Sequence, residues 1–199
     1  MQHIADFILE LDKLKTVTRK IRVRGVDRYE NPAEHSWQLA LLATSLVPFA
    51  DGAIDINRVI SMLLVHDVGE IDTGDTSAFV EEGLADRKAG ERAAVARIFG
   101  LLPSAQRDHL MSLWQEFEDA QTPESLFAHA VDRAMPVLLN LANDLQSWRE
   151  HGITHERVVQ RCRPEIEGGC PALWKYLEGQ LEAVRQRGWF DRSDSGAMV

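Results

Sequence analysis

The sequence predicts an all-α protein, a single bundle of about six to eight helices. Apolar residues recur at helical spacing along most of the 199-residue chain, and no segment shows the alternation that is typical of a half-buried strand. No internal repeat, low-complexity block or linker divides the chain. We therefore expect one domain at residues 1–190, followed by a polar, frayed tail at residues 191–199.

The first 70 residues contain three expected helices and a basic loop. A helical stripe of apolar residues begins near the N-terminus with Ile4, Phe7, Ile8 and Leu11. Residues 15–31 are rich in arginine and lysine, which indicates a loop. Asn31 and Pro32 then mark the start of a second helix, because asparagine caps a helix and proline suits its first position. A third helix is expected over residues 55–70.

Helical periodicity resumes after a loop that contains glycine and reaches about residue 84. The helices expected beyond it cover residues 85–99, a segment capped by Ser104, residues 123–148, a short segment from Thr154 to 162, and a segment from Pro171 to Gly188. Pro136 falls within the longest of these helices and cannot donate a hydrogen bond to the carbonyl of Asp132. We therefore expect a kink at Asp132.

Composition and charge restrict the class of partner. The formal net charge of −9 and the pI of about 5.2 disfavour nucleic acid, whose phosphates require clustered lysine and arginine. Cys162 and Cys170 lack CxxC spacing, so neither a disulfide framework nor a zinc knuckle is expected. No apolar run approaches the roughly 20 residues that span a bilayer, and the N-terminal segment does not resemble a signal peptide. We therefore expect a cytoplasmic protein without a membrane partner.

Ionisable side chains continue the buried stripes of three expected helices. His66 and Asp67 follow Leu63 at helical spacing, His35 begins the stripe of the second helix, and Asp132 lies inside the long helix. A buried carboxylate is costly unless a partner offsets its charge. Imidazole and carboxylate together suit a divalent cation such as Zn, Mn, Fe or Co. Separate roles as hydrogen-bonded core residues are the equal alternative at this point.

Four ordered segments of the chain resemble the HD-domain metal-dependent phosphohydrolases, whose signature is H…HD…D. The segments ENPAEHSW, LLVHDVGEIDTGD, LWQEFE and LFAHAVDRA are similar to the 5′-deoxynucleotidase subfamily in order and separation, over about residues 11–140. The resemblance implies a helical HD fold and one divalent ion (Co, Mn, Mg, Zn, Fe or Ni) bound by His35, His66, Asp67 and Asp132. It also implies a homodimer that hydrolyses 2′-deoxyribonucleoside 5′-monophosphates to deoxynucleoside and phosphate.

Two further acids match the family motif near the attacking water and the substrate. They are the catalytic candidates Glu70 and Asp75, and Asp75 is also a substrate-binding candidate. Glu70 follows Asp67 by one helical turn on the same face, so it could accept a proton from the attacking water. The alternatives are a solvated residue at a helix end for Glu70 and simple turn chemistry for Asp75, which follows a glycine.

The basic loop offers a cation for the phosphate group. Arg19 best matches the arginine that the family places before the first metal histidine, and Arg24 is the alternative. Glu116 also matches an acidic family position and has either a catalytic or a structural role. His129 stands where the family often has a lysine, one turn before Asp132, and could support that aspartate from behind.

Other functions are compatible with parts of this pattern. An HD phosphodiesterase or nucleotide triphosphohydrolase would act on another nucleotide with the same fold. A di-iron HD oxygenase would need additional paired histidines, whereas His109 and His129 stand alone between the HD pair and Asp132. A metal-stabilised binding protein without turnover is the alternative from another class, and Glu70 together with the arginine loop argues against it.

Overall fold

The structure is a computed structural model and describes residues 1–76, 79 and 83–190. Regular structure within these residues is helical, apart from one isolated β-bridge between Arg22 and Tyr29. The all-α prediction is therefore confirmed, whereas the expected tail at 191–199 lies outside the described residues. In the part of the chain that the structure describes, no helix combines the length and apolarity needed to cross a membrane.

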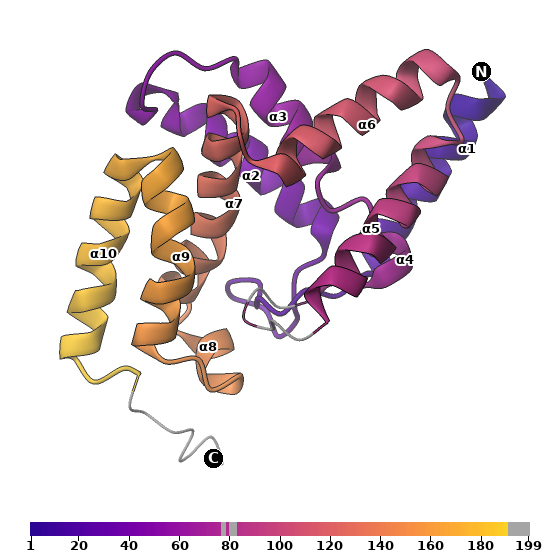
Figure 1. Ribbon diagram of the computed structural model, residues 1–199. Coiled ribbons are helices and arrows are strands. Elements are labelled where there is room, and N and C mark those ends of the chain that lie inside the picture. Colours follow the sequence, from indigo (N-terminus) through magenta and orange to yellow (C-terminus); the bar gives the residue numbers. More distant parts are fainter. Residues whose placement is uncertain (77–78, 80–82, 191–199) are drawn as a thin grey trace.

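The helices are arranged around α7, which packs against α2, α3, α6, α9 and α10. Figure 1 shows α9 and α10 together on one side of α7, while α5 and α6 extend away on the other side. In chain order the elements are α1 (Gln2–Leu11), η1 (Asp12–Thr16), α2 (Pro32–Leu46), η2 (Val47–Phe49), α3 (Ile56–Val65), α4 (Glu70–Thr73), α5 (Leu84–Phe99), α6 (Ser104–Asp119), α7 (Pro123–Ala142), α8 (Gln146–Glu150), α9 (His155–Gly169) and α10 (Pro171–Gln186).

Local sequence explains where α2 begins. The Asn31 side chain accepts a hydrogen bond from the Glu34 backbone N–H, and the Glu34 carboxylate accepts one from the Asn31 N–H, at 3.0 and 3.2 Å. Pro32 occupies the first helical position, where its missing N–H costs nothing. The expected cap at Ser104 is wrong, because Pro103 is the N-cap of α6 and Ser104 is already helical.

Two helices end earlier than their periodicity predicts. α3 ends at Val65, and tight turns connect it to α4. α7 ends at Ala142, because Asp144 and Leu145 have φ values of 52° and 57°, a left-handed conformation that stops a right-handed helix. α8 is consequently a separate element, and it turns towards the cavity described below.

Two other expectations need correction. α9 extends to Gly169 rather than ending near residue 162. In α1, Phe7 is buried as expected, but Ile4 and Ile8 are 40% and 56% exposed, so the N-terminal stripe is not a buried face.

α7 continues through Pro136 as a helix. The proline is therefore accommodated within the helix, and the kink expected at Asp132 stays a prediction.

The buried core includes side chains from α7 and from the helices packed around it. Phe127 and Val131 of α7, Ile166 of α9 and Leu177 of α10 are all fully or almost fully buried. Cys162 and Cys170 are buried in this region and free, as expected for cysteines outside a disulfide framework. The packing fixes the position of α9 along α7.

Candidate metal centre and adjoining cavities

Three of the four expected ligands form a compact cluster. His35 comes from α2, His66 from the turn that follows α3, and Asp132 from α7. Their ligand atoms all lie within 4.8 Å of one another. His35 Nε2 is 2.9 Å from Asp132 Oδ1, and His66 Nε2 is 3.8 Å from the same oxygen.

Asp67 joins this cluster through its two neighbours. Its Oδ1 lies 3.0 Å from His66 Nε2, and its Oδ2 accepts a hydrogen bond from Arg19 Nη1 at 2.8 Å. The carboxylate therefore faces the histidine with one oxygen, while the arginine holds the other. Asp67 does not belong to the group of three within 4.8 Å, so it is placed at the edge of the cluster.

The hydrogen bond of His66 to the backbone directs its second ring nitrogen towards the acids. Its Nδ1 lies 2.8 Å from the carbonyl oxygen of Leu63, and a carbonyl only accepts, so Nδ1 carries a proton. Its buried Nε2 lies 3.0 Å from Asp67 Oδ1 and 3.8 Å from Asp132 Oδ1, outside hydrogen-bond geometry. Once it has lost its proton, an imidazole nitrogen that faces two carboxylates can bind a cation. The residues present therefore fit a divalent cation.

Crowded carboxylates around the cluster support the same conclusion. Burial and the charge of Asp67 raise the pKa of Glu70 to about 10. Burial raises the pKa of Glu30 to about 7, although Arg19 opposes this shift. Burial also disfavours ionised Asp67, but the charges of His66 and Arg19 outweigh it and lower its pKa to about 2. A divalent cation would offset this buried negative charge.

Arg19, rather than Arg24, reaches the cluster from the basic loop. Arg19 Nε donates to Glu30 Oε1 at 3.0 Å, and its Nη1 lies 2.8 Å from Asp67 Oδ2 and 3.8 Å from Asp75 Oδ1. Arg24 is exposed and lines neither cavity beside the cluster. Two nitrogens of Arg19 are thus already engaged by carboxylates.

The sequence reasoning missed Glu30. This acid is 3% exposed, and its Oε1 lies 3.5 Å from His35 Nδ1 as well as 3.0 Å from Arg19 Nε. It therefore contacts both His35, a metal-ligand candidate, and Arg19, the phosphate-binding candidate. The available signal was its position directly before the helix cap in ENPAEHSW, but acids before helices are commonly exposed.

Glu70 and Asp75 both line the cavity beside the cluster. Glu70 begins α4, and its Oε2 is buried without a hydrogen-bond partner among the described residues. Gly74 has a φ of 73°, which turns the chain back towards Arg19. The Asp75 side chain is only 8% exposed, and its Oδ1 lies 3.8 Å from Arg19 Nη1.

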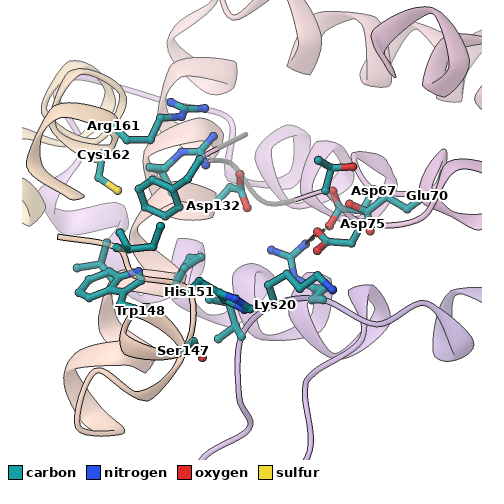
Figure 2. Close-up of a pocket in the computed structure, with 18 residues that line it drawn as sticks. Lys20, Asp67, Glu70, Asp75, Asp132, Ser147, Trp148, His151, Arg161 and Cys162 are labelled. Atoms are coloured by element: carbon teal, nitrogen blue, oxygen red, sulfur yellow. Dashed lines mark hydrogen bonds and ion pairs between the residues drawn. The ribbon is translucent and has the colours of Figure 1, made fainter. Parts of the chain in front are cut away.

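Two cavities adjoin the cluster and share its acidic wall. The first, of about 220 Å³, has Asp67, Glu70 and Asp75 on one side and Trp148 and His151 on the other, as Figure 2 shows. The second, of about 320 Å³, opens towards α5 and α6. Both are lined by Asp67, Glu70, Asp132, Arg133 and Arg161.

Of the remaining two candidates, Glu116 lies outside both cavities and His129 lines the second. Glu116 pairs with Arg58 at 2.7 Å and accepts from Thr122 at 2.7 Å, and it lines neither cavity, so the structure gives it a role in joining α3 to α6 and α7. His129 Nε2 lies 2.7 Å from the carbonyl oxygen of Phe117, and its ring stacks on Phe117 with centroids 4.1 Å apart. No hydrogen bond joins His129 to Asp132 in the described part of the chain.

Several known proteins are similar to this chain in sequence. The 5′-deoxynucleotidase HDDC2 of Dictyostelium discoideum is 30% identical over 193 residues, which are 94% of this chain and 100% of that protein. Its human namesake is 28% identical over 136 residues, and the alignment spans 68% of this chain and 65% of the human protein. The chain likewise spans 65% of the zebrafish protein of that name.

A solved structure and a family match complete the comparison. A protein from Magnetospirillum magnetotacticum, described as a predicted metal-dependent phosphohydrolase, has a TM-score of 0.87 and 40% identity, with 94% of this chain and 96% of that chain covered. The family described as HD domain matches residues 11–174. The matched range includes all four residues of the H…HD…D pattern, and the chain belongs to the HD-domain family.

Proposed function

We propose that this protein is a metal-dependent phosphomonoesterase that hydrolyses 2′-deoxyribonucleoside 5′-monophosphates to deoxynucleoside and phosphate. The observation that carries this proposal is the buried Nε2 of His66, which lies 3.0 Å from Asp67 Oδ1 and 3.8 Å from Asp132 Oδ1. The names of the relatives supply the substrate class. Hydrolysis of a phosphate monoester suits a site that combines a cation position with a buried acid.

The cation in this proposal is held by His35, His66, Asp67 and Asp132, and its identity is one of Co, Mn, Mg, Zn, Fe and Ni. When bound, it supplies positive charge that polarises a phosphoryl oxygen and activates a water molecule. Glu30 stands behind His35 and orients the imidazole that faces the cluster.

Glu70 is the proposed proton acceptor. In the metal-free protein, burial and the charge of Asp67 raise the pKa of Glu70 to about 10. A bound cation would lower that pKa, so that the carboxylate could accept a proton from the attacking water. The water oxygen bonds to phosphorus, the bond from phosphorus to the 5′ oxygen breaks, and the deoxynucleoside leaves with a proton. Asp75 and the remaining nitrogen of Arg19 face the same cavity and are proposed to contact the sugar-phosphate.

A phosphate-release assay tests this function directly. The purified protein would be loaded with each of the six metals and incubated with deoxyribonucleoside and ribonucleoside monophosphates. Release from deoxyribonucleoside monophosphates, and weaker release from ribonucleotides, is expected. A cation-loaded protein that releases no phosphate from any deoxyribonucleoside monophosphate would refute the proposal. Cleavage of cyclic or triphosphorylated nucleotides alone would favour the phosphodiesterase or triphosphohydrolase alternative.

We also propose that two copies associate through the outer face of α2. Trp37 and Leu41 are one helical turn apart and are 64% and 52% exposed in the single chain. Large apolar side chains exposed side by side favour a protein interface. Light scattering coupled to gel filtration should give a dimer for the natural protein and a monomer for Trp37→Glu, and a monomeric natural protein would contradict the proposal.

A further inference from the structure

Arg133 is a cation that the sequence pattern did not assign to the site. It directly follows Asp132 on α7, and its side chain is 15% exposed. It lines both cavities, together with Asp67, Glu70 and Asp132. An arginine in this position lies in the wall that any molecule bound beside the metal cluster would touch.

The Glu165 carboxylate on α9 binds one of the three guanidinium nitrogens of Arg133. Its Oε2 accepts a hydrogen bond from Arg133 Nε at 2.7 Å, and its Oε1 pairs with Arg161 one turn earlier on the same helix. No hydrogen bond occupies the two terminal nitrogens of Arg133 within the described residues. A guanidinium held at Nε keeps these two donors for a planar or tetrahedral oxyanion.

The packing of α9 on α7 keeps Glu165 in place. Gly169 meets α7 so closely that an added Cβ would lie 2.0 Å from the carbonyl oxygen of Leu126 and 2.8 Å from the Ala130 side chain. Glu165 lies one turn before Gly169, and Arg133 lies on the same side of α7 as Leu126 and Ala130. The close contact of the two helices therefore aligns the carboxylate with the guanidinium.

The charge around Arg19 explains why a second cation is needed. Glu30, Asp67 and Asp75 all lie within 4.0 Å of the Arg19 guanidinium, at 3.0, 2.8 and 3.8 Å. Carboxylates therefore already offset the positive charge of Arg19. A phosphate monoester brings about two more negative charges, which makes a further guanidinium in the wall favourable.

We propose that Arg133 binds the phosphoryl oxygens in this cavity and that Glu165 is the residue that positions it. Arg133 and Arg19 line the same cavity, and α9 contributes to substrate binding through the ion pair of Glu165 with Arg133. The inference rests on the proposed function only for the identity of the substrate, because any phosphate bound beside the cluster would meet the same guanidinium.

Titration of the Co²⁺-loaded protein with inorganic phosphate, followed by calorimetry, tests this inference. Arg133→Gln should weaken phosphate binding by at least about tenfold, the loss of one charge-assisted contact. Glu165→Gln, which keeps the size and removes the charge, should weaken it by about threefold to tenfold. Co²⁺ affinity, measured in the same variants, should change by less than about threefold because neither residue is a ligand.

The same helix provides a matched control. Glu167 pairs with Arg163 at 2.9 Å, and the two residues are four positions apart, as Glu165 and Arg161 are. This exposed pair, with about half of each side chain accessible, lines neither cavity. Glu167→Gln should leave phosphate affinity unchanged. A merely structural role of Glu165 would lower the melting temperature without a selective loss of phosphate affinity.

Unchanged phosphate affinity in Arg133→Gln would overturn the inference, and so would a parallel loss of phosphate and Co²⁺ binding. If Arg133→Gln does not fold, Glu165→Gln decides, and wild-type phosphate affinity in that variant would overturn it. The two proposals fail separately. Phosphate binding that depends on Arg133 in a protein without deoxynucleotidase activity would refute the function alone, whereas active Arg133→Gln with normal phosphate affinity would refute this inference alone.

Discussion

Arg19 Nη1 lies 2.8 Å from Oδ2 of Asp67, while Oδ1 of the same carboxylate lies 3.0 Å from His66 Nε2. The arginine thus fixes the rotation of an acid that is 48 residues away in the chain, and it turns the other oxygen towards the metal cluster. Because Glu30 holds the same guanidinium from behind, the basic loop, the start of α2 and the HD pair form one connected network.

Arg19→Ala should impair both metal binding and turnover, because it releases Asp67 and removes a phosphate-facing cation. We expect Co²⁺ affinity to fall about tenfold and kcat/KM to fall about 100-fold or more. Calorimetry and phosphate-release kinetics measure the two effects. Arg24→Ala is the matched control from the exposed part of the loop, and an equal loss in that variant would contradict the assignment of Arg19.

Glu70→Gln should separate catalysis from metal binding. The amide cannot accept the proton of the attacking water, so kcat should fall by about 100-fold or more while the cation still binds. The metal-free variant should be more stable than the natural protein by at least about 1 kcal/mol near pH 7. Burial raises the pKa of Glu70 to about 10, so folding at that pH requires uptake of a proton, which glutamine does not need. Thermal unfolding after chelation checks the sign, and a lower melting temperature would contradict this account.

Metal affinity should rise with pH because His66 must lose a proton. Burial favours neutral His66, but the charge of Asp67 outweighs it and raises the pKa of the metal-free imidazole to about 9. The protonated form thus contributes stability that is complete below the unfolded value near 6.5 and is lost as the pH rises through 9. Below pH 9 a cation displaces this proton, so calorimetry in buffers of different ionisation enthalpy should show proton release that decreases towards pH 9. A Co²⁺ affinity that does not change between pH 6 and pH 9 would contradict this prediction.

Gly169→Ala should destabilise the fold because α9 would have to move away from α7. An added Cβ at this position would lie 2.0 Å from the Leu126 carbonyl oxygen. We expect a loss of about 2–4 kcal/mol in the free energy of unfolding, measured by urea denaturation. The adjacent Gly168→Ala is the control, since no atom lies within 4 Å of its added Cβ and alanine favours a helix. Equal effects in both variants would exclude the close approach as the cause.

The metal-ligand candidates follow from local sequence. Helical spacing places side chains one turn apart on the same face, so the apolar stripe of α3 indicates that His66 continues inward. Short-range rules likewise predict the capping box of Asn31 and the helix start at Pro171. They do not predict the end of α7, because leucine rarely adopts the left-handed conformation that Leu145 has there.

The sequence by itself determined the helical class, the HD pattern and the identity of the acids and histidines that carry the proposed chemistry. Tertiary structure alone decided that Glu30 is buried between Arg19 and His35, and that Glu165 holds Arg133 at the shared wall of two cavities. The physical reason is how far apart in the chain the contacting residues lie. Caps and stripes depend on neighbours within about one turn, whereas these ion pairs join elements that meet only when helices far apart in the chain pack together.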